Sequence, residues 1–256
     1  MKRTLAIAVA ASTLLASAAC GDTGDDEKAS GGSRTLNVFA AASLTETFGA
    51  LGKSFESSHP GVKVRFNFGG SSALAAQINQ GAPADVFAAA SPATMKTVTD
   101  AKGAAGTPTT FVKNRLVIAV PPSDPGKVAK FADLAEPGLK VVLCATPVPC
   151  GAAAQKALAA AGLKVKPASQ EQDVKGVLTK VELGEADAGL VYRTDAKAAG
   201  AKVKGIEFPE SAKAINAYPI ATLARAPQPD LAKQFVDLVL SAPGRTVLTQ
   251  AGFEAP

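Results

Sequence analysis

The sequence is poor in several residue types that carry common protein chemistry. Its 256 residues include no Trp, two Tyr and a single His. With so few aromatic side chains, stacking platforms for nucleic acid are not expected, and we predict no nucleic-acid partner. The lone histidine, His59, provides no Ser–His or Cys–His pair for nucleophilic catalysis and fits no zinc-ligand spacing. We therefore predict a protein that is not an enzyme, with no catalytic residues, no cofactor and no direct metal ligands.

An excess of charge of one sign is also absent. The chain carries 27 Lys and Arg against 22 Asp and Glu. Lys2 and Arg3 precede an apolar run from Leu5 to Ala19 that is too short to span a bilayer, which predicts a signal peptide over residues 1–19. Removing Lys2 and Arg3 from the 27 basic side chains leaves 25 against 22 acidic ones. So small a balance does not indicate a polyanionic partner.

The first of only three cysteines follows the predicted signal directly. Cys20 after Ala18-Ala19 resembles a lipoprotein signal, although Ser17 stands where such signals usually have Leu. The Gly-, Asp- and Ser-rich residues that follow are typical of a flexible tether. We predict a lipidated Cys20 and a tether over residues 20–34, which place the chain on the extracytoplasmic side of the membrane or in the periplasm. Plain secretion with an unmodified cysteine is the alternative.

The other two cysteines form an even pair. Cys144 and Cys150 are six positions apart. In an exported chain they are expected to form a disulfide, with two free thiols as the alternative.

Strand-like and helix-like segments alternate along the chain, which predicts an α/β fold with mostly parallel sheets flanked by helices. Apolar runs at 116–120 and 217–223 bracket a middle segment that has its own strand–helix–strand pattern. We predict two lobes joined by two crossover strands, with residues 35–115 and 217–256 in lobe 1 and 116–216 in lobe 2. A ligand is expected in the cleft between them.

Two local signals give sharper expectations. Ser43 precedes Glu46 by three residues, a capping-box spacing that predicts Ser43 as the N-cap of a helix. Pro219 interrupts the second apolar run, which predicts an edge or crossover strand there because proline cannot donate to a central ladder.

Helix starts that coincide with small or donor-bearing residues recur along the chain. They fall at Ser43, Ser71, Cys150-Gly151 and Val174, and none of them needs a Lys or Arg within it to offer donors. The start of a helix offers unpaired N–H groups and a partial positive charge. Tyr192 adds a phenol O–H at the end of a predicted strand. Together these groups predict a site rich in donors and poor in acceptors, which suits a small, fully ionised oxyanion.

Several segments together resemble the molybdate-binding proteins of ABC importers. The similarity runs from about Leu36 to Phe253 and is carried by Val38-Phe-Ala-Ala-Ala-Ser-Leu44, Gly81-Ala-Pro-Ala-Asp-Val-Phe87, Glu171 to Leu178, and Gly189-Leu-Val-Tyr192. The resemblance implies a type II periplasmic-binding fold that holds molybdate or tungstate without a counter-cation and delivers it to an ABC permease. We expect a monomer.

The resemblance also implies a role for each candidate residue. Ser43 and Ser71 match hydroxyl donors of the first lobe, Val174 matches a backbone N–H donor, and Tyr192 matches a phenol donor. Cys150 stands where the family commonly has Ala, so its backbone N–H is the expected donor. A binding protein for sulfate or another tetrahedral oxyanion, an extracellular enzyme on the same fold and a surface adhesin are the alternatives.

Overall fold

The structure is a computed structural model that describes residues 34–256. The predicted signal peptide, the lipidation site Cys20 and all but the last residue of the predicted tether lie outside the described residues. The described residues all belong to one compact unit. Within residues 34–256, no helix is long and apolar enough to cross a membrane.

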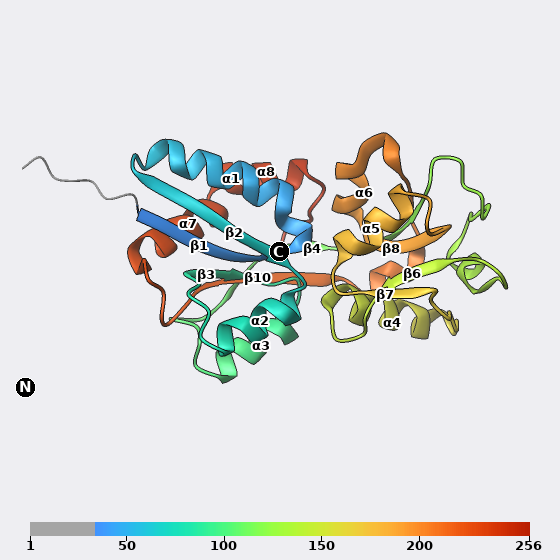
Figure 1. Cartoon of the computed structure of the whole chain (residues 1–256), viewed down its shortest axis with the longest axis horizontal. Helices are drawn as coiled ribbons and strands as arrows, with labels where there is room; N and C mark the ends of the chain where they lie inside the picture. Colours follow the sequence, from blue (N-terminus) through green and yellow to red (C-terminus); the bar gives the residue numbers. More distant parts are fainter. Residues whose placement is uncertain (1–33) are drawn as a thin grey trace, which may run out of the picture. The chain divides into compact units, whose positions relative to one another are not determined.

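A first sheet of five strands has the order β2-β1-β3-β10-β4 (Figure 1). Strands β2, β1 and β3 are parallel, whereas β10 runs antiparallel to both β3 and β4. The strands are β1 (Arg34–Ala41), β2 (Val62–Gly69), β3 (Val86–Ala88), β4 (Thr109–Asn114) and β10 (Asn216–Thr222). The helices with them are α1 (Thr45–Ser58), α2 (Ser71–Asn79), α3 (Pro92–Asp100), α7 (Pro229–Leu240) and α8 (Ala242–Gln250).

The two faces of this sheet are covered by different helices, because side chains of a strand alternate between faces. Val38 of β1 belongs to the core shared with α1 and α7, where Phe48 and Phe235 meet edge to face at 5.8 Å. Phe39, the next residue, belongs to the core shared with α2 and α3, which includes Leu74. Figure 1 shows α1 and α2 on opposite sides of the strands.

A second sheet of five strands has the order β7-β6-β8-β5-β9. Strands β7, β6 and β8 are parallel, and β5 is antiparallel to both β8 and β9. The strands are β5 (Leu116–Val120), β6 (Val141–Cys144), β7 (Ser169–Glu171), β8 (Ala188–Tyr192) and β9 (Lys204–Ile206). The helices with them are α4 (Pro149–Ala161), α5 (Val174–Glu182) and α6 (Arg193–Ala199). The 3-10 turns in residues 34–256 are η1 (Ala42–Leu44), η2 (Phe131–Ala135), η3 (Gly200–Lys202) and η4 (Pro209–Lys213).

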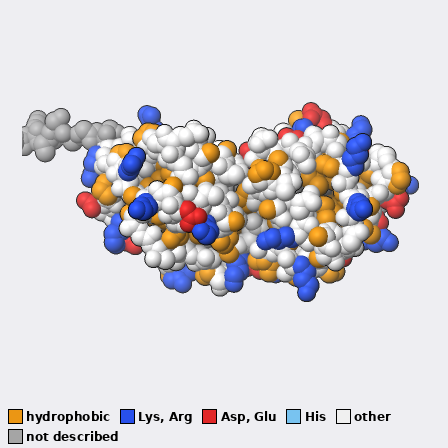
Figure 2. All heavy atoms as spheres, turned by 90° about the horizontal axis from the view of Figure 1, so that it is seen from below, with side chains coloured by type: hydrophobic (Ala, Val, Ile, Leu, Met, Phe, Trp, Pro, Cys, Tyr) orange, Lys and Arg blue, Asp and Glu red, His pale blue; other side chains and the backbone are white. Residues whose placement is uncertain are grey.

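The chain crosses from one sheet to the other twice. It leaves the first sheet between β4 and β5, at Arg115, and returns to it through β10. We call the part built on the first sheet the first lobe and the part built on the second sheet the second lobe. This arrangement confirms the predicted α/β fold of two lobes with mostly parallel sheets and two crossings. In the face shown in Figure 2, charged side chains are scattered over both lobes.

Two local predictions were wrong or incomplete. Ser43 is not an N-cap: it lies inside the turn η1, α1 begins at Thr45, and no side chain caps that helix. Pro219 is not in an edge strand, because β10 lies between β3 and β4. A register shift between Tyr218 and Pro219 lets the strand accommodate the missing N–H. The crossover role predicted for this strand is confirmed.

Candidate functional site

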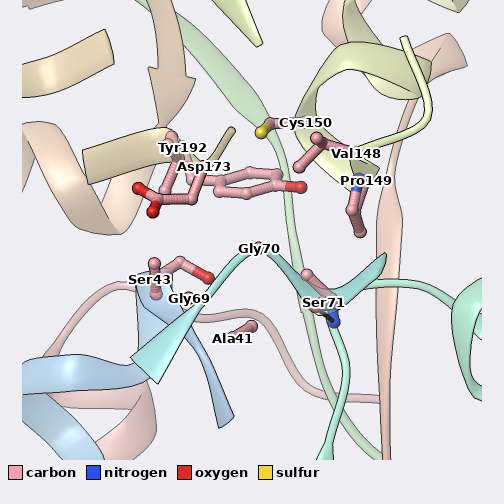
Figure 3. A pocket seen from close by; sticks show the side chains of 13 residues that line it. Ala41, Ser43, Gly69, Gly70, Ser71, Val148, Pro149, Cys150, Asp173 and Tyr192 are labelled. Carbon is pink, nitrogen blue, oxygen red and sulfur yellow. Dashed lines mark hydrogen bonds between the residues drawn. The ribbon is translucent and has the colours of Figure 1, made fainter. Parts of the chain in front are cut away.

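A small pocket is lined by residues of both lobes (Figure 3). It has about 200 Å³ of free space, including space open to solvent at its edge. The cavity volume proper is only about 10 Å³, far below the roughly 300–1,000 Å³ of sites for drug-sized ligands, so the pocket suits a small ion. The residues predicted to form the site, which all line this pocket, are Ser43, Ser71, Cys150, Val174 and Tyr192.

On the first lobe, Ser71 presents a hydroxyl at the start of α2. The side chain is buried, and its Oγ accepts a hydrogen bond of 3.0 Å from the backbone N–H of Ala90. Because this bond occupies a lone pair of Oγ, the hydroxyl proton of Ser71 remains available to a second acceptor. Ser71 is therefore a hydrogen-bond donor oriented by the β3 end of the same sheet.

The second hydroxyl of the first lobe, that of Ser43, has a partner that sequence reasoning missed. Ser43 Oγ lies 2.9 Å from Tyr218 Oη. Burial raises the pKa of the Tyr218 phenol, so the phenol stays protonated and is able to donate to Ser43. Ser43 then keeps its own proton for the pocket. Tyr218 is 175 positions away on β10, and no local pattern signals this contact.

On the second lobe, the start of α5 offers a backbone donor. Asp173 is the N-cap, and its Oδ1 accepts from the N–H groups of Lys175 at 2.8 Å and Gly176 at 3.1 Å. The N–H of Val174, the first helical residue, is not used by this cap. Asp173 is the one carboxylate among the described residues that line the pocket, and these bonds direct its oxygen to the helix.

The start of α4 brings a second backbone donor. Cys150 is the second residue of the helix, and the structure joins it to Cys144, the last residue of β6, in a disulfide. Gly151 follows; a Cβ there would collide with the backbone carbonyl oxygen of Ala145. Both features tie the start of α4 closely to the end of β6, so the first-turn N–H groups are held at the pocket.

Tyr192 closes the pocket from the end of β8. Its side chain is fully buried, and its Oη has no hydrogen-bond partner among residues 34–256. Burial raises the pKa of this phenol well above its usual value, so it stays protonated. Figure 3 shows the ring lying across the pocket. Because a buried polar group without a partner is costly, this phenol O–H is the group in the pocket that most needs an acceptor.

A cation lies next to the pocket without lining it. Lys175 Nζ is 2.8 Å from Glu46 Oε1 and 3.1 Å from Asp195 Oδ1. Burial lowers the pKa of Lys175, but the carboxylates of Asp195 and Glu46 outweigh burial and raise it overall. Burial raises the pKa of Asp195 to about 6 despite the opposing charge of Lys175. Sequence reasoning did not find this triad, because its members come from three helices.

The chemistry of the pocket is therefore that of a receptor for a small anion. Hydroxyl, phenol and N–H donors converge from both lobes, and no Lys or Arg is among the described residues that line it. No cluster of three or more His, Cys, Asp or Glu side chains in residues 34–256 is suited to a metal ion. A two-lobed fold with such a pocket between the lobes defines a solute-binding protein.

Comparison with known proteins places the chain within this class. Residues 36–254 match the family model of bacterial extracellular solute-binding proteins, and the chain belongs to that family. It is 47% identical to the molybdate-binding protein ModA of Mycobacterium tuberculosis over 241 residues, which cover 93% of this chain and 92% of the relative. It is 33% identical to the Haemophilus influenzae protein of the same name, over 87% of this chain and 91% of the relative.

Solved structures show the same fold. The periplasmic molybdate-binding protein of Azotobacter vinelandii superimposes with a TM-score of 0.76, at 22% identity, over 86% of this chain and 99% of that chain. At that level of identity the similarity concerns the arrangement of the two lobes.

Proposed function

We propose that this protein captures molybdate or tungstate from outside the cytoplasm and delivers it to an ABC permease. The observation that carries the proposal is the pocket between the lobes, where Ser43, Ser71 and Tyr192 present neutral O–H donors and no lysine or arginine of residues 34–256 is among the lining residues. The relatives named molybdate-binding protein support the choice of ion. We assign Ser43, Ser71, Cys150, Val174 and Tyr192 to the ion.

The proposed mechanism is capture by converging donors. Each hydroxyl or N–H donates to an oxyanion oxygen, and charge-assisted hydrogen bonds of this kind are about twice as strong as neutral ones. When the lobes close, water leaves and the lower local dielectric strengthens every bond. A protonated oxyanion needs an acceptor for its own proton. Among the described residues that line the pocket the one carboxylate is Asp173, and its Oδ1 already accepts from the first turn of α5, so the site favours a fully ionised ion.

Sulfate is the alternative within the same class, because it has the same charge and shape and differs in size. A competition titration separates the two ions. The proposal predicts that excess sulfate leaves molybdate binding nearly unchanged, whereas displacement at comparable concentrations would favour the alternative.

The experiment that tests the proposal is isothermal titration of ligand-free protein with molybdate and with tungstate. We expect one site per chain. Thermal unfolding against a panel of tetrahedral oxyanions provides a second readout, because a ligand that binds only the folded state raises the melting temperature. Absence of both heat and a shift in melting temperature with either ion would overturn the proposal.

We further propose that the chain is a monomeric lipoprotein anchored through Cys20, and that it is a carrier rather than an enzyme. The single histidine, His59, supports the latter, because its ring stacks on Phe55 at the end of α1 and its Nε2 contacts Gln234. Mass spectrometry of the mature protein should show a diacylglyceryl mass on Cys20. An unmodified N-terminus beyond Cys20 would refute the anchor.

The lobe boundaries of the proposal are residues 35–115 with 217–256 for lobe 1 and 116–216 for lobe 2. The membership of the strands in the two sheets supports this division. Limited proteolysis with and without molybdate gives a check, because cleavage near Arg115 is expected to slow when the lobes close.

A further inference from the structure

One ion pair joins the two lobes beside the pocket. Lys175 lies in the first turn of α5 in the second lobe, and Glu46 lies in the first turn of α1 in the first lobe. Their charged atoms are 2.8 Å apart. We propose that Lys175 is a positioning residue that latches the lobes together over the bound anion. This inference rests on the proposed function and names a residue that controls release from that site.

The position of Lys175 connects the latch to the binding groups. It directly follows Val174, which lines the pocket, and α5 contacts the turn η1 that contains Ser43. On its other side, the Lys175 ammonium meets Asp195 of α6 at 3.1 Å. Asp195 Oδ2 in turn accepts from the backbone N–H of Tyr192 at 3.2 Å. The ammonium therefore touches a group that fixes Tyr192 and a group on the opposite lobe.

The different burial of Asp195 and Glu46, the two carboxylates that Lys175 contacts, suits an ion pair that forms when the lobes close and breaks when they open. Asp195 is fully buried and belongs to the same lobe as Lys175, whereas Glu46 retains 52% of its side-chain exposure. The Lys175–Asp195 pair therefore holds the ammonium in place whether or not Glu46 is near. A prepositioned charge needs to lose little side-chain freedom when the opposite lobe arrives. Because Glu46 is half exposed, its contribution is modest, which keeps closure reversible.

Two other polar contacts between the lobes lie beside the chain crossing at Arg115, and a third joins Lys197 Nζ of α6 to the backbone carbonyl oxygen of Gln250 at 2.7 Å. Asn114 Nδ2 donates to Thr194 Oγ1 at 2.9 Å, and Arg193 Nη1 donates to Glu254 Oε1 at 3.2 Å. Residues at a hinge separate least when lobes open. The Lys175–Glu46 pair instead depends on α5 and α1 meeting, so it stabilises the closed state specifically. It is therefore expected to slow dissociation of the ion more than it speeds association.

The experiment measures molybdate association and dissociation by stopped flow for the full chain and matched variants. For Glu46→Gln we expect dissociation to be about two- to fivefold faster, as for an exposed ion pair, with association unchanged. Lys175→Arg should preserve the wild-type rate. Lys175→Met should release the ion faster than Glu46→Gln, because it also leaves Asp195 unpaired, and adding Glu46→Gln to it should have no further effect.

The matched control is Lys180→Met. Lys180 lies on the same helix and pairs with Glu171 at 2.7 Å, entirely within the second lobe, so its loss should leave both rates unchanged. Raising the salt concentration should speed release from the wild type but have less effect on Glu46→Gln, because salt screens the latch.

The outcomes separate the two proposals. If wild-type protein binds molybdate and Glu46→Gln releases it at the wild-type rate, the latch is refuted and the proposed function stands. Equal acceleration by Lys180→Met would also refute the latch, because a general change in helix α5 would then explain the effect. If wild-type protein binds neither molybdate nor tungstate, the proposed function fails and the latch fails with it.

Discussion

At the scale of single residues, the site works by giving each donor a fixed orientation. Ser71 Oγ receives the N–H of Ala90, and Ser43 Oγ meets the phenol of Tyr218. Ser71 thereby has a proton left for the pocket, Ser43 has one when Tyr218 is the donor of their bond, and Tyr192 Oη has no partner among residues 34–256. The sequence alone predicts the donors themselves, because they stand at helix starts and a strand end. It could not predict Tyr218, whose contact exists only after β10 has joined the first sheet.

Ser71→Ala should weaken molybdate binding by roughly ten- to a hundredfold, because a hydrogen bond to a charged group is worth about 1.5–3 kcal/mol. It also removes the acceptor of the Ala90 N–H, so a small fall in melting temperature is expected. Isothermal titration and thermal unfolding measure the two effects. Ser72→Ala is the matched control, because Ser72 is the next residue and does not line the pocket. Equal loss of affinity in both variants would contradict the assigned role of Ser71.

A second prediction for a single residue concerns Gly70 and the closure of the lobes. Its backbone is in an ordinary extended conformation that alanine also adopts, but an added Cβ would collide with the carbonyl oxygen of Gln172 on the other lobe. Gly70→Ala should therefore fold normally and resist closure, with at least tenfold weaker molybdate binding. Gly69→Ala should lose much less affinity, because its Cβ would meet nothing closer than 3.8 Å. Titration of both variants with unchanged affinity would show that this contact does not limit closure.

At the scale of elements, the starts of helices α2, α4 and α5 converge on one pocket from two sheets. Each helix is fixed locally: Asp173 caps α5, and the disulfide joins the start of α4 to β6. The cap and the cysteine pair are signals that the sequence carries, since both depend on neighbours within a few residues. The prediction of Ser43 as an N-cap was wrong. Ser43 is hydrogen-bonded to Tyr218 and Glu46 is paired with Lys175, so the two residues do not form a capping box.

Removal of the disulfide should affect stability more than binding. We expect Cys144→Ala with Cys150→Ala to lower the free energy of unfolding by about 2 kcal/mol, the chain-entropy value for so short a loop. The donor at Cys150 is a backbone N–H, so molybdate affinity should fall only a fewfold. Denaturant unfolding and titration measure the two changes. A loss of affinity above a hundredfold at unchanged stability would mean that the sulfur atoms contact the ion.

Asp195 should give stability a distinctive pH dependence. Its pKa rises from an ordinary value near 4 to about 6 on folding, so between these values the folded state holds a proton that the unfolded state has released. The contribution of Asp195 is fully present below about pH 4 and is lost as pH rises through 6. Compared with Asp195→Asn, the wild type should therefore lose stability, on the order of 3 kcal/mol, between pH 4 and pH 7. Denaturant unfolding at several pH values measures this difference, and a difference that is flat or opposite in sign would contradict the assignment.

At the scale of the whole molecule, the fold divides the hydrogen-bond donors between the two lobes. In the proposed function, one bound ion contacts the donors of both lobes. The alternation of strands and helices, and the two apolar runs at 116–120 and 217–223, are enough to predict two lobes from the sequence. The contacts between lobes are not, because Gly70 with Gln172 and Lys175 with Glu46 pair residues that are about a hundred or more positions apart. Such pairs depend on the final placement of the lobes, which no local pattern encodes.

The most direct test of this account is a crystal structure of the molybdate complex with anomalous scattering from molybdenum. The account predicts one molybdenum peak per chain, between the lobes. Its oxygens should lie within hydrogen-bond range, about 2.7–3.2 Å, of donors on Ser43, Ser71, Cys150, Val174 and Tyr192. A peak outside this pocket, or a lysine or arginine in direct contact with the ion, would contradict it.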